Sequence, residues 1–262
     1  MPKPTPWKDE YTLLCERCGY IIEDLDQSLP CPECGKPITE SLPERRVGTP
    51  WQQKPRFTSL LQTWWMTIRH PIRTTDLLKT SVENSTLRLA SVHWSALAGS
   101  LSWVISMYLM LVTTRSAKTS KGEDAIAWFI AGIGGGLILY FGLAGGIWVL
   151  ISIEEKGIRT ISNARKFRLP HSYARSICDH GAIGWVLATA FGGIASILVI
   201  LFESKPNIKL DSWMYLLPLV SALPGFLFFE TFAYLGLRRC KYANRSRPNP
   251  DPDRTHDTLQ PT

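Results

Sequence analysis

The stretch "AIAWFIAGIGGGLILYFGLAGGIWVLISI", residues 125–153, decides the fold class of this chain. It contains no Asp, Glu, Lys, Arg or His, and it exceeds the roughly 20 apolar residues that a helix needs to cross a bilayer. Hydrocarbon offers no water to the backbone polar groups, so a segment of this kind crosses the membrane as a helix. The stretch therefore predicts a transmembrane helix that tilts or extends beyond the bilayer.

Three further runs of the same character predict three more spans: Leu89–Val112, Gly181–Phe202 and Trp213–Leu237. Apart from tyrosines, their only titratable groups are His93 in the first run and Glu230 in the last. Such runs have no polar face to turn toward water, which argues against buried helices of a soluble protein. We predict an all-α polytopic membrane domain of four helices over residues 89–237.

Basic residues outside the four runs indicate the orientation. Residues 41–88, the loop between the second and third spans and the tail carry 20 Lys and Arg, whereas the other two loops carry 5. Positive charge collects in cytoplasmic loops. The first residues, "MPKPTPWKDEY", lack the apolar core of a secretory signal. We therefore expect a protein of the cell inner membrane with both termini in the cytoplasm.

Four cysteines near the amino terminus form the second informative feature. "CERCGY" contains Cys15 and Cys18, and "CPECG" contains Cys31 and Cys34. Two residues between cysteines let one turn aim both sulfurs at one ion, and a following glycine permits positive φ. The pattern predicts a zinc ribbon over residues 1–40 with structural Zn²⁺. Iron in a rubredoxin-like site and two disulfides in an oxidising compartment are the alternatives.

The charge of the predicted ribbon indicates which class of partner it binds. The whole chain has a formal net charge of +7, but residues 1–40 contain four Lys and Arg against eight Asp and Glu. Nucleic-acid backbones are bound by cations. We therefore expect no nucleic acid at the ribbon, and a protein partner instead.

Between the ribbon and the first span, residues 41–56 are rich in proline and predict an extended linker. Residues 57–88 predict juxtamembrane helices. The first of them has apolar residues at helical spacing: Phe57, Leu60, Leu61, Trp64, Trp65 and Ile68. This helix either lies in the lipid interface or packs on the rim of the bundle. The basic, proline-rich residues 238–262 predict a disordered tail.

Small residues repeat every fourth position in the second span, as Gly132 with Gly136 and Gly142 with Gly146. This spacing lets helix backbones approach closely, within one chain or between copies. Glu230 is the only acidic residue within the predicted spans, and it is either a proton or cation site or a carboxyl tied to a neighbouring helix.

"HSYARSICDHG", residues 171–181, brings Cys178, Asp179 and His180 together in sequence. A second metal site or a thiol nucleophile is conceivable there, although the chain has no HExxH motif and no phosphate-binding loop. The alternative is that Cys178 is buried and chemically inert.

The combination "CERCGY…CPECGKPI", a proline-rich segment, "RHPIRTTDLL" and several spans resembles bacterial zinc-ribbon membrane proteins with a Yip-family-like integral domain. The resemblance implies a cytosolic amino terminus and a role in membrane organisation or trafficking rather than catalysis. Our leading hypothesis is a non-enzymatic membrane protein whose ribbon is a docking or assembly module. The alternatives are a small transporter or channel subunit that uses Glu230, and a membrane enzyme built around Cys178, Asp179 and His180.

Overall fold

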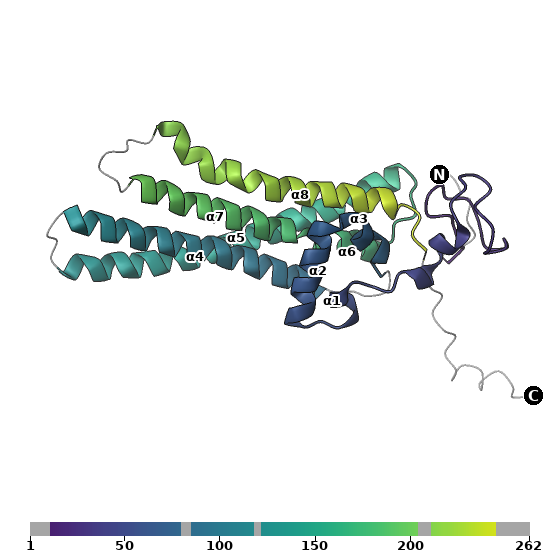
Figure 1. Ribbon diagram of the computed structural model, residues 1–262, viewed down its shortest axis with the longest axis horizontal. Helices are drawn as coiled ribbons and strands as arrows, with labels where there is room; N and C mark the ends of the chain where they lie inside the picture. Colours follow the sequence, from purple (N-terminus) through teal and green to yellow (C-terminus); the bar gives the residue numbers. More distant parts are fainter. Residues whose placement is uncertain (1–10, 80–84, 118–121, 204–210, 245–262) are drawn as a thin grey trace, which may run out of the picture.

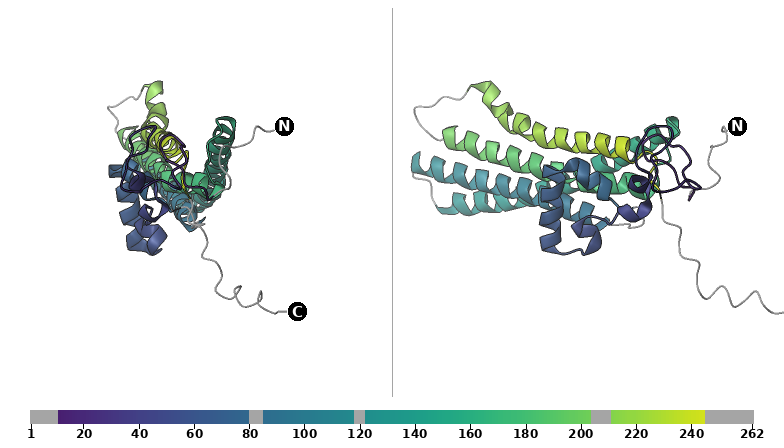
Figure 2. Two further views of the ribbon diagram at one scale, coloured as in Figure 1. Left: turned by 90° about the vertical axis from the view of Figure 1, so that its right-hand side faces the viewer. Right: turned by 45° about the vertical axis from the view of Figure 1, so that its right-hand side comes forward.

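The computed structural model describes residues 11–79, 85–117, 122–203 and 211–244. Four long helices run side by side along the longest axis of the molecule: α4 (Ser85–Ala117), α5 (Gly122–Ala164), α7 (Ile183–Glu203) and α8 (Leu217–Arg239) (Figure 1). Each is long and apolar enough to span a membrane, which indicates a multi-pass membrane protein. The cysteine-containing segment lies over one end of this bundle, here called the ribbon end (Figure 2).

The four helices correspond to the four predicted spans. The described residues contain no β-strand beyond two isolated bridges. Helix α4 packs against α5 on one side and α7 on the other, and α7 packs most extensively against α8. The α7–α8 contact needs glycine, because a Cβ on Gly184 would lie 2.5 Å from the carbonyl oxygen of Gly225. Small residues thus let the two backbones touch.

Helix α5 and the short helix α6 (His171–Gly181) extend the bundle at the ribbon end. Helix α5 continues past the predicted end at Ile153 to Ala164. Helix α6 is buried from Tyr173 onward except for Arg175, and its side chains join a core with Phe229 and Phe232 of α8. The main core of the protein is therefore at the ribbon end, and not in the middle of the spans.

Residues 41–56 do not form the extended linker that their prolines predict. They contain the 3-10 helix η2 (Pro43–Arg45) and helix α1 (Pro50–Gln53), after η1 (Ile38–Ser41). Thr49 caps α1 through a reciprocal capping box, and the Trp51 amide donates to Thr63 of α2 at 3.0 Å. These contacts hold the segment against the bundle.

Helix α2 (Phe57–Arg69) confirms the predicted amphipathic helix, with an unexpected orientation. Its small polar residues face the protein, since Thr63 and Thr67 are completely buried, whereas Phe57 and Trp65 are 59% and 61% exposed. Helix α3 (Pro71–Leu77) follows and packs on α8. Helix α2 lies across the long helices near the ribbon end (Figure 1).

The predicted disordered tail is ordered in its first part. Arg238 and Arg239 belong to the last turn of α8, and residues 240–244 continue into the ribbon. Cys240, Ala243 and Asn244 are buried. Residues 245–262 lie outside the described residues.

Candidate metal centre and its anchorage

Two tight knuckles position the four cysteines. The amide of Gly19 donates to the Cys15 carbonyl at 2.8 Å, and the amide of Gly35 donates to the Cys31 carbonyl at 2.9 Å. Gly19 and Gly35 have φ of +83° and +70°, as the sequence predicts. Positive φ closes each turn so that both sulfurs of a pair face the same point.

All four sulfurs lie within 4.8 Å of one another, and they are free thiols. Cys15 Sγ is 3.5 Å from Cys34 Sγ, and Cys18 Sγ is 3.6 Å from Cys31 Sγ. Four thiolates about 2.3 Å from a central Zn²⁺ lie roughly 3.8 Å apart in a tetrahedron. The donor set therefore fits a tetrahedral metal ion, whereas sulfurs at these separations do not form disulfides.

The electrostatics of the knuckles also favour a cation. Burial opposes ionisation of Cys15, but the amides of Cys18 and Arg17 donate to its sulfur and lower its pKa to about 7. Burial and the neighbouring Cys31 raise the pKa of Cys18 to about 12. Four thiolates this close cannot all be ionised without a positive charge between them. A divalent ion would supply it.

The apolar core of the ribbon is small. Ile22 and Ile38 are buried with Cys15 and Cys31, and few other apolar side chains pack on them. Such a core contributes little folding free energy, whereas a structural zinc site contributes about 10–16 kcal/mol in zinc-finger peptides. The metal would hold the knuckles together.

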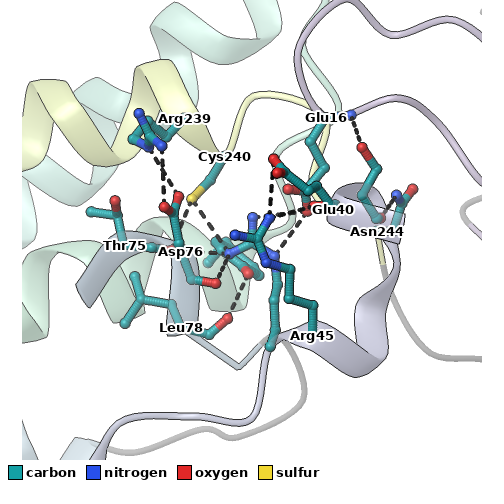
Figure 3. A network of polar contacts seen from close by, with 12 residues as sticks. Glu16, Glu40, Arg45, Thr75, Asp76, Leu78, Arg239, Cys240 and Asn244 are labelled. Carbon is teal, nitrogen blue, oxygen red and sulfur yellow. Dashed lines mark hydrogen bonds and ion pairs between the residues drawn. The ribbon is translucent and has the colours of Figure 1, made fainter. Parts of the chain in front are cut away.

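A buried ion pair anchors the ribbon to the bundle (Figure 3). Glu16, between the first two cysteines, accepts from Nε of Arg46 at 2.9 Å, and the Arg46 side chain is 3% exposed. Arg46 also donates to the Thr75 carbonyl of α3 at 3.0 Å and lies over the ring of Tyr173 from α6. Its guanidinium is 3.9 Å from the buried sulfur of Cys240. One arginine thus joins the first knuckle to α3, α6 and the end of α8.

Asn244 forms the second anchor. Its side chain accepts from the Leu14 amide at 2.9 Å and donates to the Leu14 carbonyl at 2.7 Å and to the Ser41 carbonyl. Arg168, between α5 and α6, donates to Asn244 and to the Thr12 carbonyl. The residues after α8 therefore bond directly to the backbone of the ribbon.

Two further contacts complete the anchorage. The ring of Tyr242 lies against Gly19, where a Cβ would be 2.8 Å from a ring carbon. Arg239 forms a two-point ion pair with Asp76 of α3, at 2.9 and 3.1 Å (Figure 3). The ribbon, residues 41–56 and the end of α8 form one continuous packed region.

The residues of the suspected enzyme site do not converge. Asp179 accepts from Arg88 of α4 at 2.6 Å, and the same arginine pairs with Glu155 of α5. His180 pairs with Thr49 at 2.9 Å and with the Ser176 carbonyl. Cys178 is completely buried in the core. Each side chain has a separate structural partner, because consecutive helix positions point in different directions.

Glu230 is half-buried on α8. Glu154 of α5, a like charge, interacts electrostatically with Glu230. None of the hydrogen bonds or ion pairs recorded for the described residues involves Glu230. The carboxyl is thus not tied to a neighbouring helix within the described part of the chain.

The anchoring residues had no signal in the sequence. Glu16, Arg46, Arg168 and Asn244 fall in no spacing motif, and Asn244 lies 230 positions from its partner Leu14. Their only signal is positive charge, because Arg46 and Arg168 lie in the basic segments that predict the orientation.

No protein-family model, curated protein or solved structure matches this chain.

Proposed function

We propose that the protein is a non-enzymatic, multi-pass protein of the cell inner membrane whose ribbon carries structural Zn²⁺ and docks a protein partner. The observation that carries this proposal is the anchorage of a four-cysteine head to the end of four membrane-length helices. A head fixed in this way presents its free face at a constant position. Preorganisation of this kind lowers the entropic cost of binding.

The free face of the ribbon has the composition of a docking surface. Tyr20 and Ile21 are each 40% exposed and Leu29 is 55% exposed. Exposed acidic residues lie between them in the sequence, including Asp24 and Asp26. Aromatic and aliphatic side chains within a charged rim are typical of protein interfaces. The complementary partner is a protein with an apolar patch and basic residues around it.

The positions of the basic residues support a cytoplasmic ribbon. Positively charged loops stay in the cytoplasm, and the ribbon end carries most of them. Thiols remain reduced in that compartment and are available for Zn²⁺. The likeness to Yip-family-like proteins agrees with this topology and with a role in membrane organisation.

Helix α2 is proposed to lie in the membrane interface on the same side. Its outward residues include the apolar Phe57, Leu61 and Trp65, and the Arg69 guanidinium lies over the ring of Trp65. Tryptophan with arginine is typical of headgroup-level helices. A nitroxide label at Trp65→Cys should be accessible to O₂ and protected from a polar nickel reagent. The matched label at Gln62→Cys should show the reverse, and equal accessibility at both sites would contradict this placement.

Site-specific photo-crosslinking in native membranes tests the docking function. A photoreactive residue at Tyr20 or Leu29 should give one protein adduct, identified by mass spectrometry. The same probe at Val47, which is 54% exposed but outside the ribbon, is the matched control. The adduct should disappear in a Cys15→Ser/Cys18→Ser variant. Absence of any adduct at Tyr20 and Leu29, or equal labelling at Val47, would refute docking.

A transporter or channel subunit is the second candidate, because Glu230 faces a like charge and has no bonded partner among the described residues. A carboxylate within a membrane-spanning helix is typical of proton and cation pathways. Glu230→Gln in reconstituted vesicles should abolish proton or cation flux if this candidate is correct. Absence of any flux from the wild-type chain would eliminate it.

A further inference from the structure

A groove of about 740 Å³ runs between α4, α5, α7 and α8. Gly142 and Gly146 of α5 form one wall, and Ala188 and Gly192 of α7 form the facing wall. Helices α5 and α7 both pack on α4, so the α4 residues between them form the floor. Gly142 and Gly146 are exposed, and the groove therefore opens sideways on the surface that faces lipid in a spanning bundle. Neither the anchorage nor Glu230 lines it.

The two glycine pairs of α5 have different surroundings. A Cβ on Gly135 or Gly136 would lie 2.8 or 2.7 Å from Trp103 or Val104 of α4, so this part of α5 is in close helix contact. A Cβ on Gly142 or Gly146 would meet no atom within 4 Å. The second pair does not pack against other helices in the described part of the chain, and it leaves the groove open.

Two buried polar groups line the groove without a hydrogen-bond partner. Ser106 of α4 is 6% exposed, and its hydroxyl is fully buried and unpaired among the described residues. Ser102 and Ser196 line the same groove, but each donates to the carbonyl four residues earlier. The indole N–H of Trp185 is likewise buried and unpaired. Buried donors of this kind are normally satisfied by a partner, protein or otherwise.

The two donors lie far apart along the groove. Helices α4 and α7 both begin at the ribbon end, and Ser102 lies against Gly193. In that register Ser106 is level with position 197 of α7, twelve residues beyond Trp185, or about 18 Å at 1.5 Å per residue. The groove is thus long, parallel to the membrane normal and almost entirely apolar between its ends.

We propose that this groove binds one long-chain lipid, with its hydrocarbon chain over Gly142 and Gly146 and an acceptor oxygen bonded to the hydroxyl of Ser106. A chain in this position lies parallel to the chains of the bilayer, from which it enters sideways. The volume falls within the range of about 300–1,000 Å³ that is usual for ligand sites.

Native mass spectrometry of the full chain released from membranes tests the proposal. The wild-type protein should carry one lipid per chain, and extraction should identify a single dominant species with a carbonyl or ester oxygen. Gly142→Leu/Gly146→Leu fills the groove and should lower lipid occupancy at least tenfold. Gly145→Leu is the matched control, because a Cβ there also meets no atom within 4 Å but Gly145 does not line the groove, and it should retain the lipid.

Ser106→Ala provides a test that does not require the double variant Gly142→Leu/Gly146→Leu to fold. It deletes one oxygen atom and should lower lipid occupancy severalfold while leaving the melting temperature and metal content unchanged. Equal occupancy in wild type, the double variant and Ser106→Ala would overturn the proposal. A bound mixture of lipids in the proportions of the bulk membrane would also overturn the proposal. The same holds if the wild type is a dimer and the double variant becomes a monomer without losing lipid. None of these outcomes depends on metal or partner binding by the ribbon.

Discussion

Replacement of Arg46 by methionine tests whether the buried ion pair holds the ribbon on the bundle. Methionine keeps most of the apolar volume of the arginine stem but leaves Glu16 without its main partner and the Thr75 carbonyl without a donor. The matched control is the neighbouring residue. Arg45 pairs with Glu40 across an exposed surface, and both side chains are 45% exposed.

The expected magnitude follows from burial. The Arg46 and Glu16 side chains are 3% and 7% exposed, and loss of one partner from a buried pair costs about 3–5 kcal/mol. Lys36 remains 3.5 Å from Glu16, so we expect the lower value, about 3 kcal/mol. That corresponds to roughly a 150-fold increase in the opening equilibrium. Arg45→Met should change the same equilibrium by at most about 1 kcal/mol, or fivefold.

Alkylation of Cys240 measures the opening directly. Its sulfur is fully buried beneath Arg46, and burial raises the pKa of Cys240 to about 11. In the zinc-loaded protein, Cys240 should react about 150-fold faster in Arg46→Met than in wild type. Cys178, buried in the bundle core, should stay unreactive and so show that the helices remain folded. Equal Cys240 rates in Arg46→Met and Arg45→Met would refute the anchoring role of the ion pair.

Two further predictions concern the ribbon itself. Gly19→Ala should lower the melting temperature of the zinc-loaded ribbon more than Gly35→Ala does. Both substitutions place a Cβ on a residue with positive φ, but only the Cβ at position 19 meets the ring of Tyr242. Equal losses of melting temperature would contradict the contact with Tyr242. Because the pKa of Cys18 and of Cys34 is raised, Zn²⁺ binding at pH 8 should displace at least two protons, as measured by calorimetry in two buffers, and zinc affinity should fall as the pH falls. In the metal-free ribbon the pKa of Cys18 is raised from 9.0 to about 12. The stabilisation of the fold that comes from this pKa shift is complete below pH 9 and is lost as the pH rises toward 12.

The membrane helices were predictable from the sequence because hydropathy is a local property. An apolar run without charged residues, such as residues 125–153, predicts a membrane-spanning helix from its own composition and length. The extension of α5 to Ala164 was not visible in hydropathy, since Glu154, Glu155 and Lys156 end the apolar run while the helix continues through the core at the ribbon end. The periodicity of apolar residues predicts helix α2. It does not predict which side of α2 packs against the rest of the protein.

The four-cysteine cluster was predictable for a similar reason, because each pair with its glycine is a short motif with fixed geometry. The anchorage was not, because Arg46 and Asn244 act through partners that are distant in sequence and leave no period or spacing. The prolines in residues 41–56 predict an extended linker, but Pro50 instead begins α1 behind the Thr49 cap. The chemical appearance of Cys178, Asp179 and His180 was misleading because polar residues of α6 pair individually inside the core.

X-ray absorption at the metal edge of the purified full-length protein tests the central claim most directly. A metal-loaded ribbon predicts one Zn²⁺ per chain with four sulfur ligands at about 2.3 Å. A substoichiometric metal, or a coordination shell of nitrogen and oxygen in place of sulfur, would contradict it.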